Sequence, residues 1–202
     1  MFLKYGVRVR TGETIEPVTL EEARVWCKVD PDDTTDDAML LLLISAARER
    51  AEDLTGMCIA RRQLEWRIDR LPDGGAPLEV PYPPLISLDY ITYLDTAGDS
   101  QTLSGSPDPW ILEDKDLPAR VTPLYGQSWP ATRNQIGSVL VGFTAGYTTN
   151  AKMPASLKLW IQQRICTWAS FRETLTMKGV SELPRDYVDG LLDSLRLGRF
   201  FA

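Results

Sequence analysis

Apolar residues recur at helical spacing near both ends of the chain and at every second position in between. Thr19 and Glu22 have the spacing of a capping box, which predicts a short helix over residues 19–29. A longer helix is expected over residues 35–54, because Gly56 follows it as a residue that readily takes the left-handed conformation. The predicted core stripe of this second helix comprises Leu40, Leu41, Ile44, Ala47, Ala51 and Leu54. Its charged residues, Arg48, Glu49, Arg50, Glu52 and Asp53, fall mostly off that stripe.

Two further helices are predicted after residue 150, and each begins at a proline. Pro154 opens a helix over residues 154–174, and Pro184 opens a shorter one over residues 184–195. Proline suits the first turn of a helix because its missing N–H would have no helical partner there in any case. Both helices carry apolar residues along one side, so we expect them to pack against the first two.

Residues 61–147 alternate between apolar and polar side chains, which is typical of half-buried strands. Trp110, Ile111 and Leu112 predict one short strand. Three others are predicted from alternating groups, each with its apolar members on one face: Leu64, Trp66 and Ile68; Leu78, Val80 and Tyr82; Ile86, Leu88 and Tyr90. Frequent prolines and glycines favour antiparallel pairing over parallel strands joined by helices.

The most distinctive part of this β region lies at residues 118–147. A short strand at residues 120–122 is followed by a loop that contains Pro123, Tyr125, Gly126, Trp129 and Pro130. A second strand follows, in which Val139, Val141 and Phe143 alternate with Leu140 and Gly142. This β insertion between helices says more about function than any candidate active site in the chain.

The pattern as a whole predicts an α+β fold. A bundle of about four helices, two N-terminal and two C-terminal, would carry an inserted antiparallel β-rich region. We expect residues 1–56 to form an N-terminal arm and two helices of the helical core, and residues 61–147 to form the inserted domain. Residues 154–202 would complete the core and end in a tail.

Two apolar features point to contacts with other chains. Met39, Leu42 and Leu43 make the first half of the second helix apolar nearly all round, which is typical of a central helix or of a subunit interface. We favour the interface. The C-terminal tail carries Arg196, Leu197, Arg199, Phe200 and Phe201, residue types that are enriched at binding hot spots. Its alternative role is to dock back onto the chain's own helices.

Composition narrows the kind of partner. The formal net charge is −6, from 28 acidic and 22 basic residues. Tight binding to a phosphate backbone needs clustered lysine and arginine, so the chain is a poor candidate for it, although DNA could slide past such a surface. The first residues lack the apolar core of a secretory signal, and the longest apolar run is far short of a membrane span.

Candidate chemistry is sparse. The chain has no histidine, which excludes the common histidine-based triads and zinc motifs. The aspartates between residues 30 and 37 break the EF-hand pattern, because Thr35 stands where glycine is needed and Leu41 where glutamate is needed. We read them as capping the second helix, and we expect no catalytic, cofactor or metal site. Cys27, Cys58 and Cys166 are expected to be buried free thiols in a reducing compartment.

The chain resembles a known family through an ordered series of segments: EPVTLEEARVWCKVD, DDTTDD, AARERAEDLTG, LEVPYPPLISLDYITYLD, ARVTPLYGQSWPATR and VGFTAGY, followed by a helix that begins at a proline. In this order they are similar to the head–tail connector, adaptor or head-completion proteins of long-tailed phages, prophages and gene transfer agents. The resemblance covers most of the chain and is weakest at residues 101–117 and 175–183.

The resemblance implies a non-enzymatic virion protein at the head–tail junction, made in the bacterial cytoplasm. Such proteins form a ring of about twelve copies beneath the portal and extend the DNA channel. The implied partners are the portal protein, a stopper or terminator protein of the neck or tail, and further copies of the chain. DNA would pass through the lumen without specific binding, and no membrane is involved. The C-terminal segment would reach the portal.

Two other classes of function stay open. The chain could be a carbohydrate- or receptor-binding β-module on a helical anchor, or a hydrolase that uses a carboxylate pair such as Glu113 and Asp114. A solvated loop is the simpler explanation of that pair. A ring seen by solution size or negative stain would separate a connector from a glycan-binding monomer.

Overall fold

The computed structural model describes residues 6–12, 16–104, 108–114, 117–149, 152–170 and 189–197. The chain divides into two compact units. The β unit comprises Met1–Thr14 and Arg61–Gly146, and the helical unit comprises Ile15–Ala60 and Tyr147–Ala202. The predicted α+β class with an antiparallel β region is confirmed.

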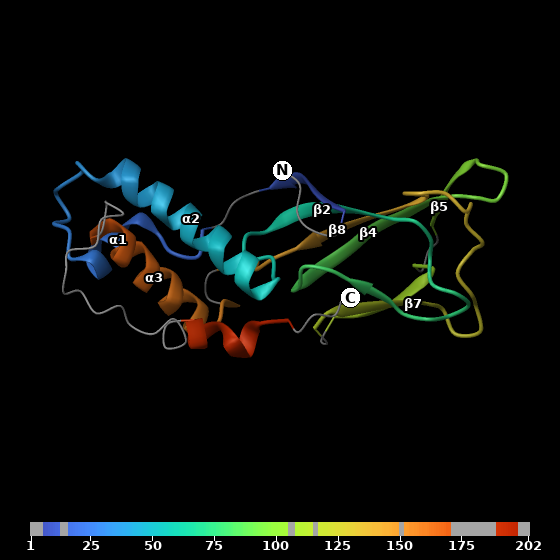
Figure 1. Ribbon diagram of the computed structural model, residues 1–202. Helices are drawn as coiled ribbons and strands as arrows, with labels where there is room; N and C mark the ends of the chain where they lie inside the picture. Colours follow the sequence, from blue (N-terminus) through green and yellow to red (C-terminus); the bar gives the residue numbers. More distant parts are fainter. Residues whose placement is uncertain are drawn as a thin grey trace, which may run out of the picture. The chain divides into compact units, whose positions relative to one another are not determined.

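The larger sheet of the β unit contains five antiparallel strands in the order β1-β2-β8-β4-β5 (Figure 1). These strands are β1 (Val7–Gly12), β2 (Arg62–Ile68), β8 (Val139–Ala145), β4 (Leu85–Leu94) and β5 (Ser100–Leu103). β8 lies between β2 and β4, and its side chains Val141 and Phe143 are fully buried. Leu64 of β2 and Ile91 of β4 stand opposite them in the sheet and are buried with them.

The smaller sheet contains three antiparallel strands in the order β3-β7-β6. These are β3 (Leu78–Val80), β7 (Ala119–Pro123) and β6 (Trp110–Glu113). Its buried side chains include Leu78, Val80, Ala119 and Val121. The strands predicted at residues 78–82, 110–112 and 120–122 are therefore confirmed, with β3 ending at Val80.

The N-terminal arm differs from its prediction. We grouped this arm with the first two helices as residues 1–56, but β1 pairs with β2 along its length, with Val9 opposite Leu64. Val7 is fully buried. The alternation of Val7 and Val9 with arginines is a strand pattern, and a strand gains most by adding to an existing sheet edge. Residues 7–12 therefore belong to the β unit.

Tyr90 also differs from its prediction, which put Ile86, Leu88 and Tyr90 on one face of their strand. The register of β4 against β8 shifts between Leu88 and Tyr90. Leu88 stands opposite the buried Phe143, whereas Tyr90 stands opposite Gly142 on the other face. A bulge adds one residue and so reverses the facing of everything that follows it.

Tyr90 organises a polar row across this other face. A Cβ atom at Gly142 would lie 2.3 Å from the Tyr90 ring, so only glycine fits beneath it. The Tyr90 hydroxyl donates a hydrogen bond to Glu65 Oε1 at 2.8 Å, and Arg8 forms an ion pair with Oε2 of the same carboxylate. These hydrogen bonds, from Arg8 first, hold the pKa of Glu65 below its usual 4.5 although burial acts in the opposite direction.

The described residues of the helical unit form α1 (Leu20–Cys27), α2 (Asp37–Thr55), α3 (Ala155–Ser170) and a 3-10 helix, η2 (Gly190–Leu195). The predicted capping box is present: Glu22 N–H donates to Thr19 Oγ1 at 3.2 Å, and Thr19 N–H donates to the Glu22 carboxylate at 3.1 Å. Gly56 ends α2 in the left-handed conformation with φ of 75°, as predicted. The core shared by these helices includes Leu40, Ile44, Ala47, Ala51, Leu157, Trp160, Ile161, Ile165 and Leu192.

Three details of the helical prediction change. Leu41, expected in the core stripe, is 52% exposed, because the buried side of α2 follows Leu40, Ile44, Ala47 and Ala51 instead. The third helix is described as far as Ser170, and the last predicted helix is described from residue 189 onward, where it has 3-10 geometry. Within the described residues, no helix combines the length and apolar character needed to cross a membrane.

The prediction of three free thiols is wrong for two of them. Cys27 at the end of α1 and Cys166 of α3 form a disulfide, with their Cα atoms 5.2 Å apart. Cys58 is free and buried, as expected. The sequence separation of 139 residues hid the pair, because only the packing of α1 against α3 brings the two cysteines together.

The disulfide gives a first prediction. Replacing Cys27 and Cys166 with serine should destabilise the helical unit by about 2–4 kcal/mol, because the cross-link restricts the unfolded chain. Denaturant unfolding under non-reducing conditions measures the loss. Reductant should lower the stability of the wild-type chain toward that of the double variant and leave the variant unchanged. Equal stability of all four samples would show that the bond does not form.

Glu65 gives a second prediction. Its folded pKa is lowered, so its carboxylate stabilises the fold above about pH 4.5, and this contribution is lost as the pH falls through the folded value. Glu65→Gln removes the titration. The free energy of unfolding should therefore fall more steeply in wild type than in the variant between about pH 5 and pH 3. Parallel pH profiles would contradict the assignment.

Candidate functional site

The predicted interface residues do not share one surface of α2. Leu42 is 69% exposed and lies on the solvent side, together with Leu41. Met39 is half-buried, and Leu43 packs against the helical core. The three predicted interface residues therefore separate: Leu43 completes the core, Met39 is half-buried, and Leu42 is open to solvent.

A second pair of open apolar residues lies on α1. Val25 is 74% exposed and Trp26 is 44% exposed, both near the end of the helix. Arg24, next to them, donates hydrogen bonds from Nε and Nη2 to Asp37 Oδ1 at 2.9 and 2.6 Å. Asp37 begins α2, so this ion pair joins the end of α1 to the start of α2.

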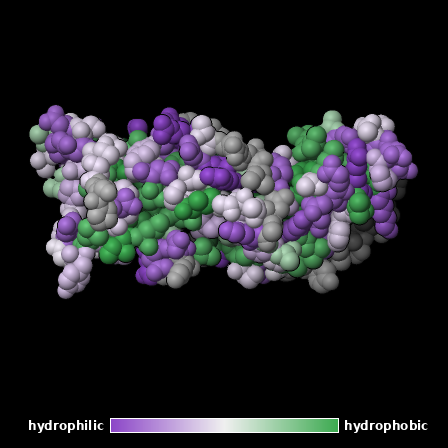
Figure 2. Space-filling model, turned by 180° about the vertical axis from the view of Figure 1, so that it is seen from behind, coloured by the Kyte–Doolittle hydropathy of each residue, from purple (hydrophilic) through white to green (hydrophobic). Residues whose placement is uncertain are grey.

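We call this region the α1–α2 corner and define it by Val25, Trp26, Leu41, Leu42 and the connecting residues 29–37. Residues 29–41 contain five aspartates and no lysine or arginine. On the face of the molecule drawn in Figure 2, hydrophobic, green atoms reach the surface among hydrophilic, purple ones. The corner thus carries four open apolar side chains and an acidic connecting segment.

The aspartates of the corner form local turns. Asp30 Oδ1 accepts the Asp32 N–H at 3.0 Å, and Asp33 Oδ1 accepts the Thr35 N–H at 2.9 Å. The hydrogen bonds from Thr35 lower the pKa of Asp33. Within the described ranges, no group of three or more metal-binding side chains is assembled, at the corner or elsewhere.

The predicted tail is described as far as Leu197. The Leu197 N–H donates to Thr55 O at 3.0 Å. The Leu197 side chain lies beside Gly56, where an added Cβ atom would be 3.7 Å from Leu197 Cδ1. Leu197 therefore covers the C-terminal end of α2. Arg196 is exposed and pairs with Asp193, with 3.3 Å between Nη1 and Oδ1. The tail therefore begins by docking onto its own chain. Arg199, Phe200 and Phe201 lie outside the described residues.

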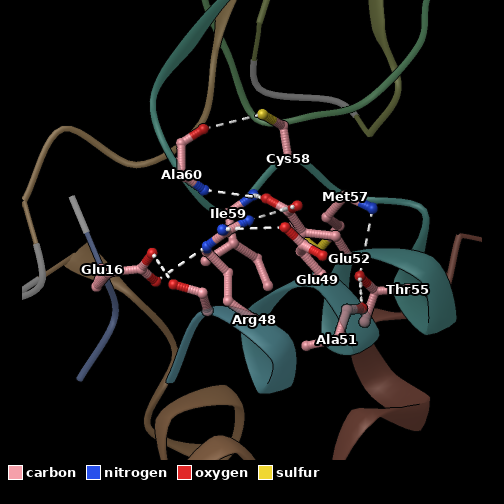
Figure 3. A network of polar contacts seen from close by, with 11 residues as sticks. Glu16, Arg48, Glu49, Ala51, Glu52, Thr55, Met57, Cys58, Ile59 and Ala60 are labelled. Atoms are coloured by element: carbon pink, nitrogen blue, oxygen red, sulfur yellow. Dashed lines mark hydrogen bonds and ion pairs between the residues drawn. The ribbon is translucent and has the colours of Figure 1, made fainter. Parts of the chain in front are cut away.

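A buried ion cluster within the helical unit was not predicted (Figure 3). Arg48 is 4% exposed and Glu52 is 9% exposed, although the sequence placed both off the core stripe. Arg48 Nη1 donates to Glu52 Oε2 at 3.1 Å, and Arg48 Nε donates to Glu16 Oε2 at 2.9 Å. Burial lowers the pKa of Arg48, but the charges of Glu52 and Glu16 raise it by more, so the guanidinium stays charged.

Glu52 also binds backbone that follows α2. Its Oε1 accepts the N–H groups of Ile59 and Ala60 at 2.9 and 3.2 Å. Ile59 O in turn accepts the Tyr147 N–H at 3.2 Å. The signal in the sequence was the spacing of Arg48 and Glu52, which puts both on one side of a helix beside Ile44 and Ala51.

This cluster lies where the chain enters and leaves the helical unit. The chain passes between units after Thr14, after Ala60 and after Gly146. Glu16, Ala60 and Tyr147 are therefore the first or last helical-unit residues described at these three passages. The buried pair on α2 thus contacts the first two of these residues directly, Glu16 through Arg48 and Ala60 through Glu52. It is linked to Tyr147 through Ile59.

The cluster gives a third prediction. Glu52→Ala should destabilise the chain by about 3–5 kcal/mol, because it leaves buried Arg48 and two backbone N–H groups with a partner removed. Glu52→Gln should cost less, since the amide oxygen can still accept from the backbone. Glu49→Gln is the matched control: Glu49 contacts Arg48 at 3.6 Å but its side chain is 53% exposed, so its loss should stay within about 0.5 kcal/mol. Equal losses at positions 49 and 52 in denaturant unfolding would contradict the role of the cluster.

Comparison with known proteins gives structural matches only. No protein-family model matches the chain, and no curated protein matches its sequence. A chain in the neck of an empty gene transfer agent particle, computed with C6 symmetry, shares 18% identity with a TM-score of 0.75, and 97% of each chain is covered. A chain in the virion of a native gene transfer agent particle shares 20% identity with a TM-score of 0.72, again over 97% of each chain.

A third match is a chain in the neck of a native gene transfer agent particle, computed with C12 symmetry. It shares 19% identity with a TM-score of 0.66, over 96% of this chain and 98% of that chain. Both units are therefore matched together and nearly from end to end. The resemblance drawn from the sequence is confirmed at the level of the fold: the chain has the fold of chains from the neck and virion of gene transfer agent particles.

Proposed function

We propose that the chain is a structural head–tail connector, or adaptor, of a tailed phage or phage-like particle. The observation that carries the proposal is the fold likeness to particle-neck chains over nearly the whole length of both chains. The ordered sequence segments that resemble head–tail connectors support it independently. In this role the chain is part of the virion at the head–tail junction, and it acts by assembly and not by catalysis.

The proposed assembly is a ring of copies beneath the portal. The neck structures that share the fold were computed with C6 and C12 symmetry, and this supports a ring of about twelve copies. Ring formation needs a lateral surface, and Leu42 is the predicted interface residue that is most open to solvent. Met39 is half-buried beside it, and Leu43 would act from the core by supporting the helix.

The proposed partners are the portal protein on the head side and a stopper or terminator protein on the tail side. The ring would extend the DNA channel. Net charge of −6 suits a lumen past which DNA slides, because few phosphate contacts could form.

Imaging of assemblies tests the proposal. Purified full-length chain, alone and mixed with the portal protein of the same particle, is examined by sedimentation velocity and negative-stain microscopy. Rings, free or on portals, are expected. A monomer that does not bind portals but binds glycans on an array would contradict the connector role and indicate a carbohydrate-binding module instead.

The tail gives a fourth prediction. We propose that Arg196, Leu197, Arg199, Phe200 and Phe201 contribute to the contact with the portal. Leu197 also caps the end of α2, so deletion after Leu197 is a cleaner variant than deletion after Leu195. Removing residues 198–202 should leave a folded, soluble chain that joins DNA-filled heads poorly, since a ring multiplies the loss at each contact.

Yields of completed heads and attached tails measure the effect of the truncation. Arg196→Ala in the full-length chain is the companion variant, because Arg196 is exposed and its loss leaves the Leu197 contact in place. Normal particle yield from both variants would remove Arg196 and residues 198–202 from the portal contact.

A further inference from the structure

The long loop between β7 and β8, residues 124–138, carries the two most exposed large apolar side chains among the described residues. Tyr125 is fully exposed and Ile136 is 87% exposed. Loops of more than about a dozen residues without secondary structure of their own are uncommon in compact domains and are usually functional. The loop is also the most distinctive segment of the sequence.

This loop is fastened to the β unit near its middle. The Trp129 N–H donates to Gly74 O at 2.8 Å, and the Trp129 Nε1–H donates to Ala76 O at 2.8 Å. The Trp129 side chain is 8% exposed. A buried tryptophan with both donors satisfied anchors the chain on either side of it.

The second half of the loop is fastened as well. The Arg133 N–H donates to Leu94 O at 2.9 Å, and the Gly137 N–H donates to Asp69 Oδ1 at 2.8 Å. Leu94 N–H then donates to Ser138 O at 2.9 Å. Ile136 therefore projects from backbone that is held on both sides.

Tyr125 stands on a tight turn. The Gln127 N–H donates to Leu124 O at 2.9 Å, and Gly126 has φ of 77°, a value that favours glycine. A backbone held this way loses little conformational entropy on binding, and tyrosine is enriched at binding hot spots. Fastened backbone under fully exposed apolar side chains is the arrangement of a docking element.

The composition of the loop indicates a protein partner. Arg133 is its one charged residue, and the rest are uncharged polar, aromatic, aliphatic or small residues. Nucleic acid would require several basic side chains. A protein surface with apolar and acidic side chains would suit the loop. Its apolar side chains could contact Tyr125 and Ile136, and its acidic ones could pair with Arg133 without like-charge repulsion.

We propose that the 124–138 loop of one copy docks onto the α1–α2 corner of a neighbouring copy. The corner offers open apolar side chains at Val25, Trp26, Leu41 and Leu42, and an acidic segment in which Asp37 is paired with Arg24 while Asp30, Asp32 and Asp33 stay exposed. A contact between two different surfaces of identical chains is the kind that closes into a ring when its rotation allows. The inference rests on the proposed ring and names the two surfaces that would form it.

Site-specific cross-linking tests the contact. Full-length chain with p-benzoylphenylalanine at position 125 is mixed with ¹⁵N-labelled wild-type chain under conditions in which rings form, and then irradiated. Mass spectrometry of mixed-isotope peptide pairs identifies links between copies. Links from position 125 to residues 25–42 are expected. Links elsewhere on the second copy, links to a different particle protein, or no link between copies would each overturn the proposal.

Two truncations complete the test. Tyr125→Ala and Ile136→Ala should each weaken self-association on the order of tenfold or more, without altering the melting temperature, because both side chains are exposed in the single copy. Ile111→Ala is the matched control, since Ile111 is 49% exposed on β6 and lies outside the loop. Rings that form with unchanged affinity in both loop variants would overturn the docking contact and leave the connector role standing. Absence of rings in wild type, alone and on portals, would instead refute the connector role.

Discussion

The helical unit depends on one buried charge pair. Arg48 and Glu52 are almost excluded from water, and a buried charge is tolerated only when it is paired and hydrogen-bonded. The pair meets this condition by recruiting Glu16, which precedes α1, and the N–H groups of Ile59 and Ala60, which follow α2. The cost of burying the pair is thus offset only when Glu16, Ile59 and Ala60 lie where the structure has them. For a proposed ring subunit, this fixes the points from which the chain continues into its β unit.

The β unit is stabilised differently. Burial of apolar side chains holds its sheets together, and closely packed polar side chains cover one face of the larger sheet. Gly142 leaves room for the Tyr90 ring, and Tyr90 and Arg8 then hold Glu65 as a carboxylate. The same unit fastens a long loop through Trp129 while leaving Tyr125 outside. Exposed apolar side chains on a rigid backbone are unfavourable in water unless they bind a partner. Their presence agrees with the proposed connector role, in which the chain assembles with other chains.

Local patterns in the sequence predicted the elements well. The capping box at Thr19, the left-handed Gly56 and the alternation along β8 each depend on neighbours in sequence, and each is present. Features that depend on distant partners were missed. The disulfide joins residues 139 positions apart, the bulge that reverses Tyr90 leaves no mark in the alternation, and Arg48 is buried because other segments cover it. The apolar surplus of α2 was recognised, but which members face solvent was decided by packing against α1 and α3.

Hydrogen exchange of the backbone amides tests the central role of the buried pair most directly. If Glu52 holds the chain that follows α2, the N–H groups of Ile59 and Ala60 should exchange as slowly as those in the middle of α2, although neither residue lies in a helix. The Tyr147 N–H, bonded to Ile59 O, should be protected with them. Exchange of these amides as fast as that of the exposed residues 30–35 would contradict the role of the cluster.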